Sequence, residues 1–192
     1  MRISLLLAAV VAATLFVKPA RAAITINMQE TGGDVVFFYS GSLDITGLAP
    51  AFTNTSTDSF IEPGIRAWVV FGGPARPPMD QYSNALTGPR EYGTGGNIDP
   101  DADSTGDVFG FSGDFNVLRL PANYISGTRL SGMMTFGSTD FNTLGIDTAS
   151  APYVWSIVGT GDTITLQVVP EPTSALFLCG TGALACLRRR RR

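Results

Sequence analysis

The sequence predicts an all-β protein, either an antiparallel β-sandwich or a jelly-roll-like domain, and three observations lead to that fold class. In the body of the chain, apolar residues recur mostly at every second position, as they do on strands that bury one face. Glycine and proline, with 22 and 12 residues among 192, provide many turns without reaching a low-complexity composition. No stretch of the body repeats apolar residues at helical spacing over the length of a helix, so short strands joined by turns are expected.

The clearest strand pattern is YVWSIVGTGDTITLQVV, residues 153–169. Alternate residues are apolar on both sides of a Gly-Thr-Gly-Asp stretch at 159–162, which has the composition of a tight turn. This pattern predicts a β-hairpin. Further strands are expected at 24–28, at 34–46 with a break at Gly41-Ser42, at 65–72, at 107–120 around Ser112-Gly113, and at 128–136.

Two stretches of the body are expected to lack strands. Gly73 to Pro100 is rich in glycine and proline and weakly apolar, which predicts a long loop. Residues 139–147 leave room for one helical turn. Trp68 and Trp155 fall within strand patterns and are expected in the core.

The first 22 residues have the layout of a secretory signal peptide. A basic start is followed by the apolar run Ile3–Val17, and Ala20 and Ala22 are small residues at positions −3 and −1 of a cut after Ala22. The alternative is an uncleaved N-terminal anchor, although a spanning helix needs about 20 apolar residues. The chain is therefore divided into a signal peptide at 1–22, a secreted β-domain at 23–169 and a terminal segment at 170–192.

The β-domain is strongly acidic, with fifteen Asp and Glu residues against five arginines and no lysine, a formal net charge of −10. Such a domain repels nucleic acid phosphates, so no nucleic-acid partner is expected. The chain has no histidine, and both cysteines, Cys179 and Cys186, lie in the terminal segment. The Ser-His-Asp and Cys-His types of catalysis are thereby excluded from the domain, and no enzyme is expected.

One acidic stretch, DPDADSTGD, has the spacing of a calcium-binding loop. Asp99, Asp101, Asp103 and Asp107 stand at its positions 1, 3, 5 and 9, and alternate carboxylates of a tight loop can surround a calcium ion. The sixth position is Ser104 rather than glycine, and no glutamate closes the loop at the twelfth. The alternative is a solvated acidic loop without a metal. No other cofactor is predicted.

Two further kinds of site remain open on the residues alone. Paired carboxylates such as Glu62 and Glu91 would suit glycoside hydrolysis, although no motif singles them out from surface acids. The aromatic rings of Tyr82, Tyr92 and Tyr124 would suit stacking on sugars, or else packing in the core or loops.

The chain ends with Pro170-Glu171-Pro172, fifteen mostly apolar or small residues at Thr173–Leu187, and five arginines. As a helix the apolar run spans about 22 Å, whereas the bilayer core is about 30 Å thick. The arginines favour a cytoplasmic end, and the two prolines keep the triplet extended outside the helix. The terminal segment is thus expected to anchor the chain only temporarily.

This order of triplet, short apolar run and arginine cluster resembles the PEP-CTERM sorting signal of Gram-negative bacteria. The resemblance implies export through the Sec translocon, a transient inner-membrane anchor, and recognition by exosortase with cleavage near Pro170, Glu171 and Pro172. It implies delivery to the cell surface or extracellular matrix, often in the context of exopolysaccharide and biofilm. A structural or interaction role follows from it. The alternative is a polysaccharide- or calcium-binding β-sandwich module.

The body also resembles one that recurs among PEP-CTERM proteins. The segments that carry this similarity are Gly41–Gly47, Leu120–Gly127 and Tyr153–Pro172. That type of body implies no particular activity.

Overall fold

Alternating apolar residues form two β-sheets in the computed structural model, which describes residues 22–102 and 104–170. Sheet A has seven strands in the order β7-β12-β13-β1-β2-β11-β8. Its strands are β1 (Ala23–Thr31), β2 (Asp34–Gly41), β7 (Leu86–Thr87), β8 (Thr105–Gly106), β11 (Leu130–Phe136), β12 (Tyr153–Ile157) and β13 (Thr163–Val168).

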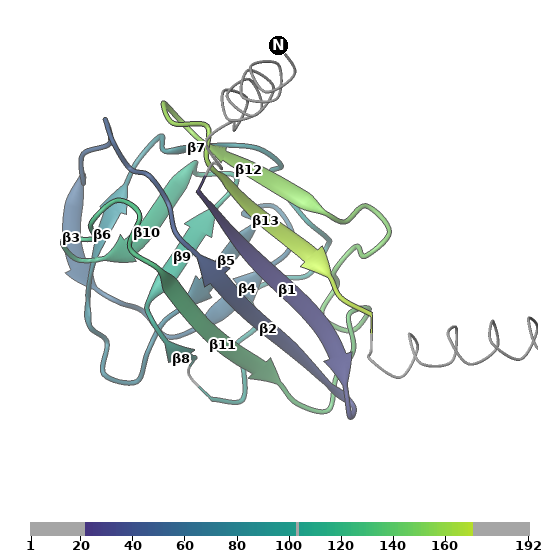
Figure 1. The fold of residues 1–192 in the computed structure, drawn as a ribbon. Coiled ribbons are helices and arrows are strands. Elements are labelled where there is room, and N and C mark those ends of the chain that lie inside the picture. Colours follow the sequence, from purple (N-terminus) through teal and green to yellow (C-terminus); the bar gives the residue numbers. More distant parts are fainter. Residues whose placement is uncertain (1–21, 103, 171–192) are drawn as a thin grey trace, which may run out of the picture.

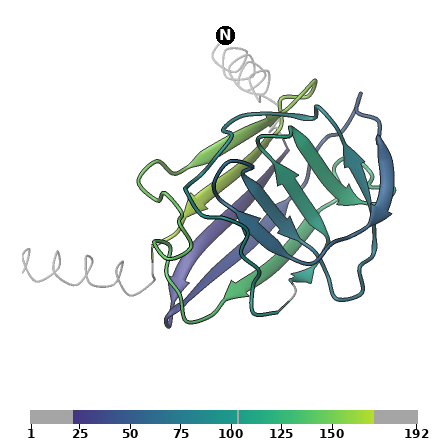
Figure 2. The ribbon, with the colours of Figure 1, turned by 180° about the vertical axis from the view of Figure 1, so that it is seen from behind.

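Sheet B has six strands in the order β3-β6-β10-β9-β5-β4 and lies behind sheet A in Figure 1. The view from the opposite side brings sheet B to the front (Figure 2). Its strands are β3 (Phe52–Thr55), β4 (Phe60–Glu62), β5 (Trp68–Phe71), β6 (Pro78–Tyr82), β9 (Phe109–Ser112) and β10 (Val117–Pro121).

The core lies between the two sheets. Alternate residues of β1 and β2 from sheet A, such as Ile26 and Phe37, are fully buried there with Phe71 and Phe111 from sheet B. Trp155 of β12 is also fully buried, and its ring centre lies 4.6 Å from that of Phe111 across the interface. Both layers therefore share one apolar interior, and the all-β fold class is confirmed.

The expected hairpin is confirmed at β12 and β13. These strands pair antiparallel, and the turn between them closes with a hydrogen bond of 2.7 Å from the Ile157 amide to the Asp162 carbonyl. Gly159 and Gly161 both have positive φ, at 94° and 72°, a conformation that favours glycine. Strands also form within the other expected ranges, but in the range 34–46 only β2 forms, and no strand follows the Gly41 break.

The expectation of a purely antiparallel fold is wrong at one pair. Strand β13 runs parallel to β1, with Ala23 opposite Thr163 and Met28 opposite Val168. Because β1 already forms an antiparallel hairpin with β2 on its other side, its second edge is open to a strand from a distant part of the chain. The periodicity of apolar residues does not indicate whether two distant strands pair parallel or antiparallel.

The expected loop from Gly73 to Pro100 is also wrong in part, since it contains β6 and β7. Residues Met79, Tyr82 and Leu86 of these strands are buried, although prolines and glycines flank them. Residues 139–147 contain one hydrogen bond of helical type, from the Leu144 amide to the Asp140 carbonyl (3.1 Å), and form turns rather than a helix.

The described part of the chain contains no helix that is long and apolar enough to cross a membrane. The expected signal peptide at 1–22 falls almost entirely outside the described residues, as do the apolar run at Thr173–Leu187 and the five arginines. Strand β1 begins at Ala23, the residue after the expected cut.

Candidate functional site

The first residue of the expected sorting triplet lies directly at the end of sheet A. The amide of Val169 still donates to the carbonyl of Met28 at 2.8 Å, which continues the ladder between β13 and β1. Pro170 follows at once and is exposed. Glu171 and Pro172 lie outside the described residues. A proline ends the ladder here because it has no amide hydrogen to donate.

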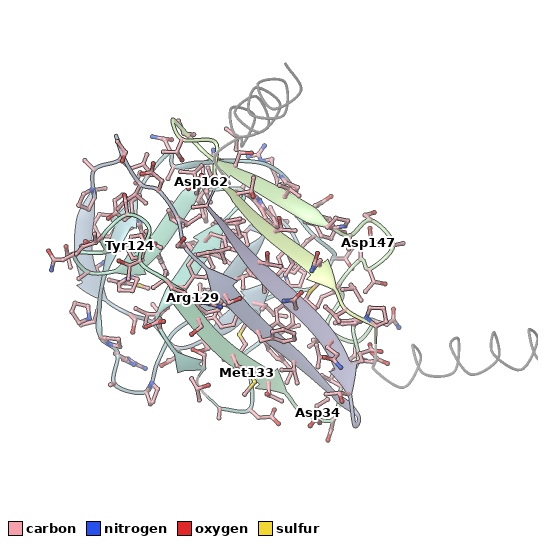
Figure 3. The ribbon with its side chains drawn as sticks, viewed as in Figure 1. Asp34, Tyr124, Arg129, Met133, Asp147 and Asp162 are labelled. Atoms are coloured by element: carbon pink, nitrogen blue, oxygen red, sulfur yellow. The ribbon has the colours of Figure 1, made fainter. Side chains whose placement is uncertain are left out.

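Carboxylates lie near this end of sheet A: Figure 3 shows Asp147 beside the end of β13 and Asp34 at the tip of the β1–β2 hairpin. The Asp34 carboxylate accepts from the Ser138 amide at 2.9 Å, and that of Asp147 accepts from the Ala149 amide at 3.0 Å. Hydrogen bonds hold the pKa of Asp147 below its ordinary value, the largest effect coming from Ser150, and those from Thr143 do the same for Asp140. Asp140 and Asp147 therefore stay ionised and give this end negative charge.

The family model for the PEP-CTERM protein-sorting motif matches residues 168–192. The chain carries a PEP-CTERM sorting motif. Motifs of this kind are recognised by exosortase and direct export toward the cell surface. No curated protein and no solved structure matches the chain.

The PEP-CTERM motif and the folded body share residues. The matched segment begins at Val168, which is the last residue of β13 and packs partly buried against the core. Since β13 lies between β12 and β1, its residues are held by two neighbouring strands. The matched motif therefore begins inside the folded sheet, at the last residue of β13.

In the structure, two aspartates of the acidic stretch that suggested a calcium site, Asp101 and Asp107, are spread along β11 rather than gathered around one point. The amide of Asp101 donates to the carbonyl of Thr135, and the amide of Asp107 donates to that of Ser131. Both acceptors belong to β11, and four residues of a strand span about 13 Å, whereas calcium ligands lie within about 2.6 Å of the ion. The remaining described carboxylate, Asp99, is exposed.

Ser104 separates these aspartates because it is turned inward. Its hydroxyl donates to the carbonyl of Gly72, and its amide donates to the Ser59 hydroxyl at 2.8 Å. Within residues 22–102 and 104–170, no three His, Cys, Asp or Glu residues form a group able to hold a metal. Asp103 lies outside the described residues, so calcium binding stays a prediction that a calcium titration of the melting temperature can test.

The three tyrosines considered for sugar stacking are buried instead. Tyr82, Tyr92 and Tyr124 are 3%, 0% and 9% exposed, which leaves no ring face open to a polysaccharide. The hydroxyl of Tyr92 donates to the Trp68 carbonyl at 2.8 Å. The core interpretation of these residues is therefore the correct one.

The two glutamates considered for glycoside hydrolysis, Glu62 and Glu91, have different surroundings. Glu62 forms an ion pair with Arg66 at 3.6 Å, and Glu91 is exposed. The structure thus gives Glu62 a basic partner within its own chain.

The three segments that resemble a recurring PEP-CTERM body meet at one end of the fold. The Tyr124 hydroxyl accepts from the Leu43 amide at 3.0 Å and donates to the Thr128 carbonyl at 2.6 Å. The Asp162 carboxylate accepts from the Asp44 amide at 2.6 Å, and Asp162 is only 4% exposed. We call these residues the Tyr124–Asp162 junction, and its two named side chains are labelled in Figure 3. These hydrogen bonds connect the three segments to one another and so give them a structural role.

Sequence reasoning missed one feature, a second apolar cluster on the face of sheet B that points away from sheet A. It consists of Trp68, Val70 and Val117, with Phe60 packed against it. Arg119 lies over it, its guanidinium carbon 4.5 Å from the centre of the Trp68 ring. Four apolar residues in a row at Trp68–Phe71, all buried, were a signal that this strand is covered on both faces.

Proposed function

We propose that this protein is an exported cell-surface or extracellular-matrix protein whose β-domain has a structural or interaction role in an exopolysaccharide or biofilm matrix. The observation that carries the proposal is the PEP-CTERM motif at residues 168–192, joined without a linker to a folded, acidic β-domain. In this proposal the domain has no catalytic role.

The proposed route has three steps in a Gram-negative cell. The signal peptide directs the chain to the Sec translocon, and the terminal apolar run then holds it transiently in the inner membrane. Exosortase cleaves near the Pro170 triplet and releases the domain for delivery to the outside. The domain that leaves the membrane is acidic and lacks cysteine, because both cysteines belong to the terminal segment.

The test is replacement of Pro170-Glu171-Pro172 by three alanines in the native host. We expect the full-length chain to accumulate in the inner membrane, and the shorter mature form to disappear from the surface fraction. Immunoblots of the fractions measure both. Unchanged size and location of the altered chain would contradict the proposal, and mass spectrometry of the wild-type protein's ends defines the mature form.

A second candidate function is a polysaccharide-binding module. It is favoured by the outer face of sheet B, where Phe52 and Phe115 are 45% and 51% exposed beside Arg119 and Arg66. Exposed aromatic rings beside hydrogen-bond donors are suited to sugar rings, which have apolar faces and polar rims. Retention of the protein on exopolysaccharide purified from its host would distinguish this function from a purely structural one.

A further inference from the structure

Arg119 is the most unusual charged residue on the outer face of sheet B. It lies on β10, and its stem and guanidinium lie over the apolar cluster that contains Trp68. Its side chain is partly buried, and desolvation lowers the pKa of the guanidinium. The group nevertheless stays charged at any physiological pH, because a guanidinium does not lose its proton in proteins.

This partly buried charge has only neutral partners among the described residues. The Nε of Arg119 donates to the Gln81 side-chain oxygen at 3.0 Å, and no residue of the described ranges accepts from its two terminal amino groups. Three other arginines each pair with a carboxylate, namely Arg66 with Glu62, Arg76 with Asp58 and Arg90 with Asp114. In a domain with three acids for each arginine, Arg119 is left facing outward without an anion.

A shallow hollow of about 40 Å³ lies beside Arg119 and is lined also by Phe52, Asn54 and Gln81. One water needs about 10–15 Å³ of such accessible space, so the hollow has room for a small polar group such as a carboxylate. Gln81 is the register partner of both Phe52 and Arg119, so these three residues form a row across β3, β6 and β10. The hollow therefore has an exposed aromatic ring on one side and a fixed cation on the other.

We propose that this hollow, the Arg119 site, binds the carboxylate of an acidic sugar unit in an extracellular polysaccharide, with the sugar ring against Phe52. Because Gln81 holds Nε, the two terminal amino groups are left to form the paired hydrogen bonds that arginine makes to carboxylates. The exposed ring of Phe52 offers an apolar surface to the sugar ring. This inference rests on the second candidate function, a polysaccharide-binding domain.

The charge of the whole domain opposes an acidic polymer, but only at long range. At physiological ionic strength, charges are screened over about 8 Å, so distant carboxylates have little effect at the Arg119 site. Arg66, on the same face, is paired with Glu62 and adds little net charge, so the guanidinium of Arg119 is the charge that dominates at the hollow. The local field at the hollow therefore favours an anion.

The experiment compares two polymers with the same backbone. The full-length chain is purified in detergent with its five terminal arginines replaced by glutamine, so that this cluster does not bind the polyanion. It is titrated with polygalacturonate, which carries a carboxylate on each sugar, and with the fully methyl-esterified form, which is neutral. We expect binding to polygalacturonate to be about tenfold tighter or more, because the charged hydrogen bonds to Arg119 are lost with the ester.

Two arginine variants test the site itself. Arg119→Gln should weaken polygalacturonate binding about tenfold, whereas Arg129→Gln removes the same charge from an exposed position and should leave binding within about twofold. Phe52→Ala changes an exposed side chain, and a lower affinity for both polymers is expected with an unchanged melting temperature. This variant keeps the test valid if Arg119→Gln loosens the apolar cluster beneath it.

Three results would overturn the inference: no binding of polygalacturonate, equal binding of the two polymers, or equal loss from Arg119→Gln and Arg129→Gln. Sorting is measured separately in the host. If the protein is processed and reaches the surface but does not bind polygalacturonate, only the proposal of the Arg119 site is contradicted.

Discussion

At the scale of single residues, the five tyrosines share one property. Each has a phenol pKa above its ordinary value, chiefly because burial disfavours the phenolate, and the group comprises Tyr39, Tyr82, Tyr92, Tyr124 and Tyr153. In the unfolded chain the same phenols titrate near pH 10. The folded state thus binds protons that the unfolded state releases.

The sign of this difference predicts alkaline unfolding. Stability from these tyrosines is fully present below about pH 10 and falls as the pH rises toward their folded pKa values. We expect phenolate absorbance to remain absent near pH 10 and then to appear in one step, together with loss of near-UV circular dichroism. A gradual phenolate titration near pH 10 with unchanged circular dichroism would contradict this prediction.

At the scale of elements, the Tyr124–Asp162 junction ties loops from both sheets together. One hydroxyl, that of Tyr124, bonds to the backbone of segments 81 and 4 residues away. A buried backbone group left without a partner costs about 1–3 kcal/mol, more than a net hydrogen bond contributes.

Tyr124→Phe should therefore lower the free energy of unfolding by about 1–3 kcal/mol, measured by urea denaturation. Tyr82→Phe is the matched control, since Tyr82 is also buried but its hydroxyl makes no hydrogen bond within the described residues. The control should change stability much less. Equal effects of the two substitutions would mean that the junction is no structural tie.

At the scale of the whole molecule, the fold holds the first two residues of the sorting motif, Val168 and Val169, in sheet A. Pro170 is one residue beyond the last β13 hydrogen bond, so an enzyme that engages the triplet meets the acidic end of the domain. This close approach is expected to slow processing, because the folded end limits access to the peptide.

A spacer tests that expectation. Six residues of glycine and serine inserted between Val169 and Pro170 should speed conversion to the mature form, followed by pulse-chase labelling in the host. The same insertion between Gly96 and Asn97, in an exposed loop, is the control and should leave the rate unchanged. Equal rates for both insertions would show that the sheet does not hinder exosortase.

The sequence by itself determined the all-β class, the β12–β13 hairpin and the sorting motif. Each of these depends on residues close together in the chain: alternation along a strand, glycines in a tight turn, and a short linear signal. Strands β6 and β7 were not predicted, because the prolines and glycines around them obscure the alternation of apolar residues. These segments form strands because their apolar side chains are buried against the other sheet.

The tertiary structure alone decided the parallel pairing of β1 with β13, the Tyr124–Asp162 junction and the surroundings of Arg119. In each case the partners are far apart in the chain, as Tyr124 is from Leu43, by 81 residues. Alternation tells which side of a strand faces the core, but not which strand lies beside it or what lies over its outer face. Phe52 and Arg119 became neighbours on one surface only because β6 pairs with both of their strands.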